Sequence, residues 1–595
     1  MNFATSARKT LSLCAALLAG VGGLAMATPA MATTDDAVIA IPQVQPLPAT
    51  AAATPAIPLS GNPVRDAMAS IRAGRWDVAR AQISAIADRQ LAAIVRAELF
   101  LAPNSPRVEG VELRALLNDA PTVPQASRIA SLAQRRGVAD LPALPGERRL
   151  GWAGSSPRRG NPRSVSDAAL GGLPRAIQAR ITADDPAGAE AMLAEAETRL
   201  SAPALTEWRQ RIAWSYYIEN DDVGARRMAA LAQNGAGEWV AQADWTQGLA
   251  SWRQNDCRSA MAGFRSAAMR ANESELVAAA NFWFARAATA CGAPAEAQPA
   301  LRTAARLEET FYGILAAETL GLADNAGADD ASAAARQRVA ALPNIRSAMA
   351  LANAGERALA DQLVRHQARI GSAEDHAALA EIAGQMNLPE TQLFLAHNAP
   401  SGVRPDRSAR FPVPQWAPAS GWRINPALVF AHTLQESQFR SNVVSPAGAV
   451  GLMQVRPGTA NDMGLQSMGG DLTNPGVNMA LGQSYIEHLR DNAATGGLLP
   501  KVIAAYNAGP APVARWNSEI RDNGDPLLFI ESIPYWETRA YVGTVLRNLW
   551  VYERQMGSAS DSLAKLAAGQ WPHVPGAPNV ASRTDRSGNR ARGGR

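Results

Sequence analysis

The longest stretch of the chain has the residue pattern of short, paired helices. Residues 63–399 are dominated by alanine, leucine, arginine and glutamate, and they contain hardly any runs of β-branched residues. These residue types favour helices, and the apolar ones recur at helical spacing. Helix pairs are predicted at residues 66–73 and 76–87, 187–200 and 205–217, and 239–254 and 259–271. Pairs that recur about every 30 to 40 residues predict an α-solenoid of the tetratricopeptide type, and hence an all-α fold.

The first 32 residues have the organisation of an export signal. Arg8 and Lys9 form a basic start, residues 11–27 are an apolar, alanine-rich core, and residues 30–32 read Ala-Met-Ala, a small-x-small cleavage site. The apolar core is short for a membrane span, and no other apolar run reaches span length. We therefore expect signal peptide 1–32 to be removed, leaving an exported, soluble protein in the periplasm with no integral membrane segment.

Three cysteines occur in the sequence. Cys14 lies in the signal and follows Leu13, where a lipoprotein site requires a small residue, so a lipid anchor is disfavoured. Cys257 and Cys291 are 34 positions apart, about one repeat, and we expect them at equivalent places in adjacent repeats. An even pair in an exported protein favours a disulfide, and the spacing is not that of a Cys-x-x-Cys redox pair. Two cysteines without further ligands do not form a zinc site, and the sequence implies no metal and no cofactor.

Composition divides the rest of the chain. The sequence predicts a disordered linker at residues 33–62, the solenoid at 63–399, an extended proline-rich tether at 400–420, a catalytic domain at 421–556 and a disordered basic tail at 557–595. Residues 141–163 contain four prolines and predict an irregular crossing between two helical segments, or a loop that contacts a partner; the crossing is favoured. The net charge of +4 suits anionic envelope polymers but is too small to argue for nucleic acid.

One carboxylate lies at the end of an apolar helical run. Asn425 can cap and Pro426 can open this helix, whose apolar residues recur at i, i+3, i+4 and i+7 from Ala427. Glu436 follows, near the negative end of the helix dipole and beside apolar side chains, and both settings disfavour its ionised form. A carboxyl that stays protonated near neutral pH can donate a proton to a glycosidic oxygen. Taken alone, Glu436 is more simply a solvated glutamate that closes a helix.

Polar residues after Glu436 gather in blocks between predicted helices. The first block continues through Ser445 to Gln454, where a serine, two glycines and an amide can approach a ligand. The second, residues 474–478, predicts a capped helix start with structural asparagines. The third is Ala-Tyr-Asn-Ala-Gly-Pro at residues 505–510, a helix that ends at a glycine. The fourth, residues 531–542, leads into a helix with an apolar face.

In this order and spacing, the blocks resemble the catalytic domain of soluble lytic transglycosylases. The shared signatures are Glu-Ser, Gly-Leu-Met-Gln, Ala-Tyr-Asn-Ala-Gly and Ile-Pro-Tyr-x-Glu-Thr-Arg-x-Tyr-Val. The resemblance is closest over residues 411–552, and it extends more loosely to the helical stretch, because a solenoid precedes the catalytic domain in the large members. It implies an all-helical, goose-type lysozyme fold with a very small hairpin around residues 445–451.

The resemblance also implies roles for individual residues. Glu436 would be the catalytic acid and then the base. The substrate-binding residues would be Ser445 and Gln454 beside it, Met453 lining the cleft, Tyr506 and Asn507 positioning the sugar or the glutamate, and Glu537 as a second cleft carboxylate. Glu531 is a weaker candidate that can instead cap a helix. Arg456 departs from the family pattern, where an apolar residue is usual. His432 could tune Glu436, but a packed or solvent-facing histidine is favoured.

The implied reaction is non-hydrolytic cleavage of the MurNAc–GlcNAc β-1,4 bond of peptidoglycan strands, giving 1,6-anhydro-MurNAc products. The residues agree, because hydrolysis needs a second carboxylate and no Asp or Glu occurs between Ser437 and Asn461. Two alternatives stay open: a hydrolytic muramidase that uses Glu537, and an inactive glycan-binding scaffold. The solenoid could recruit envelope protein partners or guide the glycan strand, and the sequence does not separate these roles.

Overall fold

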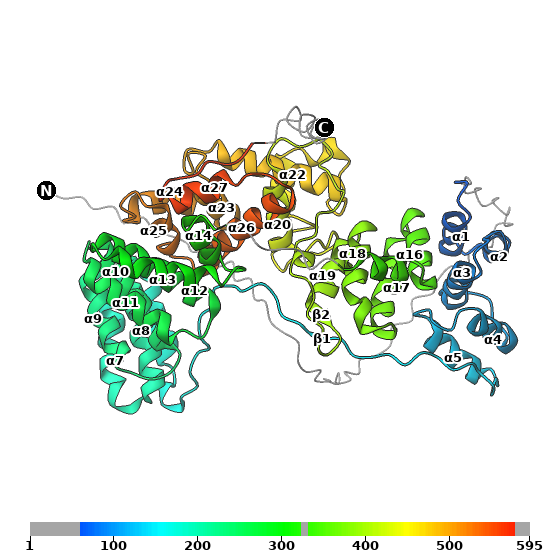
Figure 1. Ribbon diagram of the computed structural model, residues 1–595, viewed down its shortest axis with the longest axis horizontal. Coiled ribbons are helices and arrows are strands. Elements are labelled where there is room, and N and C mark those ends of the chain that lie inside the picture. The colour runs from blue at the N-terminus through cyan, green and yellow to red at the C-terminus, as the bar shows by residue number, and fades with distance from the viewer. Residues whose placement is uncertain (1–59, 323–330, 577–595) are drawn as a thin grey trace, which may run out of the picture. The chain divides into compact units, whose positions relative to one another are not determined.

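The computed structural model describes residues 60–322 and 331–576 (Figure 1). The predicted export signal and nearly all of the predicted linker lie outside the described residues. The described residues divide into two compact units, residues 60–145 with 346–363 and residues 146–322 with 331–345 and 364–576. The stretch predicted as one solenoid is thus shared between the two units. Among residues 60–322 and 331–576, no helix combines the length and the apolar character that a membrane span requires.

The first unit is built from short helices. They are α1 (Pro63–Arg72), α2 (Trp76–Ser84), α3 (Arg89–Leu101), α4 (Gly110–Asp119) and α5 (Ala126–Arg135), joined by residues 346–363 of α16 (Pro343–Asn353) and α17 (Arg357–Ile370). The later residues are held to α1 by polar contacts: Arg65 Nε donates to the carbonyl of Ala354 at 3.0 Å, and Arg72 pairs with Glu356 at 2.8 Å.

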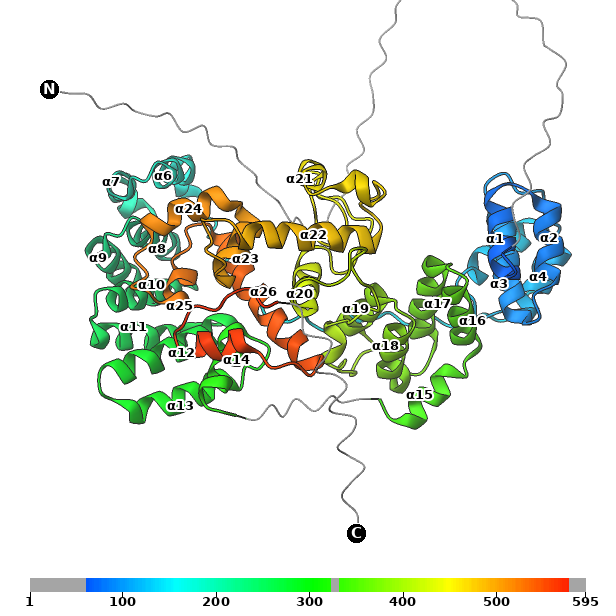
Figure 2. The same cartoon turned by 90° about the horizontal axis from the view of Figure 1, so that it is seen from above.

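The second unit begins with four helix pairs that stack along the chain (Figures 1 and 2). After the short η1 (Ala168–Leu170), the pairs are α6 (Leu173–Thr182) with α7 (Pro186–Ala196), α8 (Ala202–Ile218) with α9 (Asp222–Gln233), α10 (Trp239–Arg253) with α11 (Cys257–Arg270), and α12 (Ser274–Ala290) with α13 (Pro294–Ala305). The short η2 (Glu197–Arg199) follows α7. This arrangement agrees with the predicted repeats of paired helices.

The turn inside each pair follows one pattern. A residue with positive φ ends the first helix, and these residues are Asp184, Asn220, Asn255 and Gly292. Asparagine, aspartate and glycine are the residues that adopt this backbone conformation most readily. In the first three turns the next residue is an aspartate whose carboxylate accepts a hydrogen bond from the first turn of the second helix. The sequence therefore encodes the repeat in its turns more clearly than in its helices.

A disulfide joins two neighbouring pairs. Cys257 and Cys291 are bonded, with their Cα atoms 5.6 Å apart. Cys257 is the first residue of α11, whereas Cys291 follows the last residue of α12. The two cysteines thus lie on opposite sides of their turns, which differs from the equivalent places expected from their spacing. When the helix pairs stack, the start of α11 lies beside the end of α12. Cys257, after one turn, therefore meets Cys291, before the next turn.

The remaining elements of the second unit include those that carry the candidate site. They are α14 (Phe311–Thr319), α15 (Ala333–Ala340), η3 (Ala373–Asp375), α18 (His376–Gln385), α19 (Pro389–His397), η4 (Ser408–Arg410), α20 (Pro426–Glu436), α21 (Pro457–Asp462), η5 (Leu465–Met468), α22 (Pro475–Arg490), α23 (Leu499–Ala508), α24 (Pro510–Glu519), α25 (Pro526–Glu531), α26 (Trp536–Gln555) and α27 (Asp561–Ala567). Helix α20 packs on α26, and α23 packs on α26 as well.

The all-α prediction is confirmed. Within the described residues, the strands are β1 (Gly151–Trp152) and β2 (Asn398–Ala399), which pair antiparallel. Strand β1 lies in the proline-rich segment 141–163, which otherwise has no helix or strand, as its composition predicts. Buried apolar residues of the stacked pairs and of α20 to α27 form a single hydrophobic cluster.

The predicted extended tether and the predicted disordered tail both contain residues that pack in the core. In the predicted tether, Phe411 is buried with its ring 5.8 Å from that of Tyr552. The predicted disordered tail forms α27, in which Leu566 is fully buried and Ser562 accepts a hydrogen bond from Trp550 Nε1 at 3.0 Å. Both segments are rich in residues typical of linkers, but each contains a few apolar side chains that find a partner only in the folded protein. Residues 577–595 of the predicted tail lie outside the described residues.

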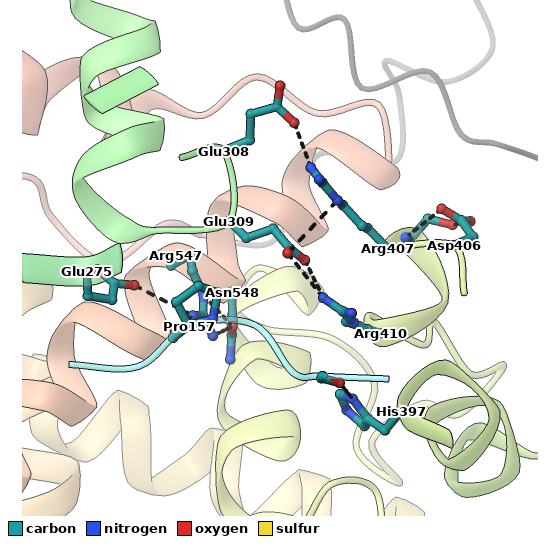
Figure 3. A network of polar contacts seen from close by, with 12 residues as sticks. Pro157, Glu275, Glu308, Glu309, His397, Asp406, Arg407, Arg410, Arg547 and Asn548 are labelled. Carbon is teal, nitrogen blue, oxygen red and sulfur yellow. Dashed lines mark hydrogen bonds and ion pairs between the residues drawn. The ribbon is translucent and has the colours of Figure 1, made fainter. Parts of the chain in front are cut away.

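A network of ion pairs fixes α26 against the helix pairs (Figure 3). Arg547 on α26 donates to the carbonyl of Pro157 and lies 3.9 Å from the buried carboxylate of Glu275 on α12. Burial raises the pKa of Glu275 to about 7 and lowers that of Arg547 to about 10, since each charge is removed from water. Beside them, Arg410 pairs with Glu309 at 2.9 Å. The helix that supplies part of the candidate site is thus held by the helical repeats.

Candidate active site

Helix α20 places Glu436 as the sequence predicts. Asn425 caps the helix through its side chain, which accepts from the Ala427 amide at 2.9 Å, and Pro426 occupies the first helical position. Residues 427–433 are buried, and Glu436 is the last residue of the helix. The apolar run is therefore the buried part of a capped helix, and the carboxylate follows directly after it.

The pKa of Glu436 is raised to about 7. Burial of the carboxyl group is the main cause, because it disfavours the charged form. The hydroxyl of Tyr541, which donates to Glu436 Oε1 at 2.5 Å, acts in the opposite direction, and the negative charge of Glu537 adds to the rise. Near neutral pH both forms of Glu436 are populated, so this carboxyl can serve as an acid and as a base.

Two further residues lie beside Glu436. No role for Tyr541 is predicted from the sequence, and for His432 a packed or solvent-facing role is favoured. Tyr541 lies on α26, and its hydroxyl lies between Glu436 and His432, whose Nδ1 is 2.8 Å away. His432 is fully buried one turn before Glu436, so it does not face solvent. The signal for Tyr541 was its place in the fourth block, one helical turn after Glu537.

The loop after Glu436 is held by its own polar side chains. Ser445 Oγ accepts from the Ala449 amide at 3.0 Å, and Gln454 Nε2 donates to the carbonyl of Gly451 at 2.9 Å. Val450 makes isolated β-bridges with Val444 and Val455, which form the small hairpin expected here. The two predicted substrate contacts thus have polar atoms that stabilise the loop beside Glu436.

Met453 differs from its expected place in the cleft. Its side chain is fully buried, and a Cβ atom added at Gly482 on α22 would overlap its sulfur. Its amide donates to Asn478 Oδ1 at 2.8 Å, and its carbonyl accepts from the Tyr506 hydroxyl at 2.9 Å. Met453 therefore anchors the loop in the core, because an unbranched thioether can fill the space that Gly482 leaves.

Helix α23 places Tyr506 near the carboxylate. The Tyr506 ring lies 4.4 Å from the His432 ring, and burial together with the charge of Glu436 raises the pKa of Tyr506 well above its usual value. Its neighbour Asn507 accepts a hydrogen bond from Thr538 Oγ1 at 2.6 Å, which ties the end of α23 to α26. Tyr506 is thus brought to Glu436, whereas the side chain of Asn507 contacts α26.

The two glutamates of the fourth block, Glu531 and Glu537, have different environments. Glu537 is exposed in the first turn of α26, and its charge acts on Glu436. Glu531 is buried, accepts from the Tyr312 hydroxyl at 2.8 Å and lies 3.7 Å from Arg159. Glu537 is therefore the carboxylate of this block that acts on the site, and Glu531 belongs to the packing of the helical repeats.

Arg456 and possible metal ligands are the last features to place. Arg456 is exposed at the start of α21. Within the described part of the chain, no group of three or more His, Cys, Asp or Glu side chains is placed to hold a metal ion. The arrangement offers proton transfer by Glu436, with Glu537 as a second carboxylate whose charge acts on it.

Comparison with known proteins identifies the segment that carries the site. Residues 416–528 match the family model of the transglycosylase SLT domain, a range that includes Glu436 and Tyr506 and ends before Glu537. The soluble lytic murein transglycosylase of Escherichia coli (strain K12) is 35% identical over 158 residues, which are 26% of this chain and 24% of that protein. That of Salmonella typhimurium is 34% identical over 157 residues, 25% of this chain and 24% of the relative. The match therefore spans about a quarter of the length of these curated relatives.

The likeness in fold extends further than the likeness in sequence. The crystal structure of the 70-kDa soluble lytic transglycosylase of Escherichia coli aligns with 86% of this chain and 99% of its own, with a TM-score of 0.51 and 19% identity. At this identity the alignment bears on the fold, including the helical repeats that precede the site. Residues 416–528 thus carry a transglycosylase SLT domain around Glu436, and over this part the chain is similar to soluble lytic murein transglycosylases.

Proposed function

We propose that this protein is a peptidoglycan lytic transglycosylase. It cleaves the MurNAc–GlcNAc β-1,4 bond without water and leaves a 1,6-anhydro-MurNAc end. The observation that carries the proposal is the state of Glu436, a partly buried carboxyl with a pKa of about 7 at the end of α20. The SLT domain match supports the same reaction, since the relatives similar to this segment are named soluble lytic murein transglycosylases.

One carboxyl can perform both proton transfers of this reaction. Glu436 first gives its proton to the glycosidic oxygen as the bond from that oxygen to C1 of MurNAc breaks. The resulting carboxylate then takes the proton of the sugar's own 6-hydroxyl while O6 bonds to C1. Glu436 ends protonated as it began, and no water is consumed. The intramolecular nucleophile is favoured by proximity, which replaces the second carboxylate that hydrolysis requires.

A hydrolytic muramidase is the second candidate, because one observation favours it. The charge of Glu537 acts on Glu436 from the first turn of α26, so a second carboxylate is present beside the acid. In a muramidase Glu537 would activate a water molecule, and the product would have a reducing end. An inactive glycan-binding scaffold is the third alternative.

Mass spectrometry of the fragments released from purified sacculi distinguishes these candidates. We expect anhydro-ended muropeptides from the wild-type protein and none from Glu436→Gln, with Glu537→Gln keeping the anhydro product. Glu195→Gln, an exposed residue of α7, is the matched control and should release fragments as the wild type does. Reducing-end products that disappear in Glu537→Gln would establish a muramidase, and no release by the wild type would favour the scaffold.

The cellular setting belongs to the same proposal. The predicted signal peptide at residues 1–32 would direct export, and the periplasm is where peptidoglycan strands are accessible to such a protein. The helical repeats at residues 173–305 would guide the glycan strand or bind an envelope protein. The domain division proposed here follows the sequence, with the catalytic part at residues 421–556 extended by the packed helix α27.

A further inference from the structure

His432 is joined to the candidate acid by two consecutive hydrogen bonds. Its Nδ1 lies 2.8 Å from the hydroxyl oxygen of Tyr541, and that hydroxyl lies 2.5 Å from Glu436 Oε1. The imidazole is fully buried, and its other nitrogen, Nε2, is buried without a hydrogen-bond partner. Within the described residues, the His432 side chain therefore makes a single hydrogen bond, and that bond leads to Glu436.

The surroundings of His432 keep it neutral. Burial lowers the pKa of His432 to about 3. The titratable groups around it are Tyr541 on α26, Tyr506 on α23 and Glu436 on its own helix, and the charge of Glu537 acts on Glu436. The hydroxyl of Tyr506 is directed to the carbonyl of Met453 rather than to the imidazole. A neutral imidazole carries one N–H, so the position of that proton decides how the chain of hydrogen bonds is arranged.

The unpartnered Nε2 selects one of the two tautomers. A proton on Nε2 would be a buried N–H donor without an acceptor, which is rarer and more costly than an unused acceptor. A proton on Nδ1 is donated to the Tyr541 oxygen. Tyr541 then has its own O–H left for Glu436 Oε1, and its oxygen is already occupied by the imidazole N–H. In this arrangement Glu436 Oε1 accepts the hydrogen bond from Tyr541.

We propose that His432 is a positioning residue that holds the Tyr541 hydroxyl as a donor to Glu436 and so stabilises the carboxylate formed after Glu436 gives up its proton. The inference rests on the proposed function and concerns its second step, in which the carboxylate acts as a base. No proton leaves His432 or Tyr541 in this role. The imidazole acts through Tyr541 and does not contact the substrate.

Three variants on one helix test the inference. His432→Leu removes the N–H, whereas His432→Asn offers an amide N–H at the position of Nδ1. Thr433→Val is the matched control, because Thr433 is also fully buried and its hydroxyl finds no hydrogen-bond partner in the described part of the chain. The ionisation midpoint of Glu436 is read from the pH dependence of its carboxyl band by infrared difference spectroscopy, with Glu436→Gln to assign the band.

We expect His432→Leu to raise the midpoint of Glu436 by about one pH unit, since the carboxylate loses a donor that is held in place. His432→Asn and Thr433→Val should keep the wild-type midpoint. The alkaline limb of the pH profile of fragment release should move in the same direction as the midpoint. An unchanged midpoint in His432→Leu, or an equal rise in His432→Asn, would overturn the inference.

A measurement on the unmodified protein covers the case in which a variant does not fold. In protein labelled with ¹⁵N-histidine, the nitrogen chemical shifts of His432 report which ring nitrogen carries the proton. A proton on Nδ1 is expected, and a proton on Nε2 would refute the arrangement. Both spectroscopic readouts are independent of catalysis, so a wild-type protein without activity on sacculi would count against the proposed function while these data still decide the role of His432.

Discussion

At the residue scale, the site depends on the carboxyl group of Glu436. The hydroxyl of Tyr541 favours its ionised form, and the charge of Glu537 disfavours it. The position of Glu436 after a buried, capped helix is readable from the sequence, and so is the direction of its pKa shift. The size of that shift is set by contacts from α26, where Tyr541 lowers the pKa of Glu436 and Glu537 raises it. Residues 105 and 101 positions away along the chain therefore decide how the acid behaves.

The raised pKa of Glu436 predicts a pH-dependent cost in stability. The carboxyl has an ordinary pKa of 4.5 and a pKa of about 7 in the folded protein. Between these values the folded state binds more protons than the unfolded state, so the free energy of unfolding falls as pH rises, by about 3 kcal/mol in all. Glu436→Gln removes this dependence, and its stability relative to the wild type should rise by that amount between pH 4.5 and 7.

Urea unfolding of both proteins over this pH range measures the effect. Glu537→Gln provides a second test. Loss of the Glu537 charge should lower the pKa of Glu436, so the fall in the free energy of unfolding should end at a lower pH than in the wild type. A stability difference between the wild type and Glu436→Gln that does not vary with pH would show that burial does not raise the pKa of Glu436.

At the element scale, the turns between paired helices organise the repeats. Positive-φ residues at positions 184, 220, 255 and 292 reverse the chain, and helix-capping aspartates follow three of them. Cys257 and Cys291 lie next to two of these turns and close a loop that contains α11 and α12. The bond thus restrains the connection between neighbouring pairs.

Removing this disulfide should destabilise the second unit. A closed loop of this length restricts the unfolded chain enough to contribute about 3–4 kcal/mol to stability. The double variant Cys257→Ser with Cys291→Ser should lose this amount in denaturant unfolding, and the wild type should fall to the same value when a reductant is added. A wild-type protein whose unfolding midpoint ignores the reductant would contradict the prediction.

At the scale of the whole second unit, the helical repeats and the SLT segment share one core. Phe311 on α14 stacks on Trp550 of α26, with ring centroids 5.2 Å apart and both side chains buried. Arg547 joins α26 to α12 and to the segment that contains Pro157 (Figure 3). Since α26 also carries Tyr541, the packing of the repeats fixes one wall of the site.

A shared core predicts that the repeats and the site unfold together. Phe311→Ala should destabilise the protein by roughly 3–5 kcal/mol, because it leaves a cavity against Trp550. Tryptophan fluorescence and fragment release should be lost in the same thermal transition, at a lower temperature than in the wild type. Val223→Ala, an exposed position on α9, is the control and should be silent. Two separate transitions, with activity surviving the first, would refute a common core.

Local residue patterns were sufficient to predict several features of this protein. The all-α fold followed from residues that favour helices and lack β-branched runs, and the start of α20 followed from Asn425 and Pro426, because helix propensity and capping act over a few neighbours. Glu436 was identified by the blocks around it, and the small hairpin near Ser445 was expected from the same resemblance. These features depend on residues that are close in sequence.

Contacts between distant residues decided the rest. The packing of Phe411 and of α27, the burial of Met453 beneath Gly482, and the chain of hydrogen bonds from His432 through Tyr541 to Glu436 each join residues from different elements. No local pattern specifies such a partner, because burial and hydrogen bonding are satisfied only when the helices are packed. The sequence by itself determined which elements form and which carboxyl is the candidate acid, whereas the tertiary structure decided what surrounds that acid, since its desolvation and its hydrogen bonds exist only in the assembled core.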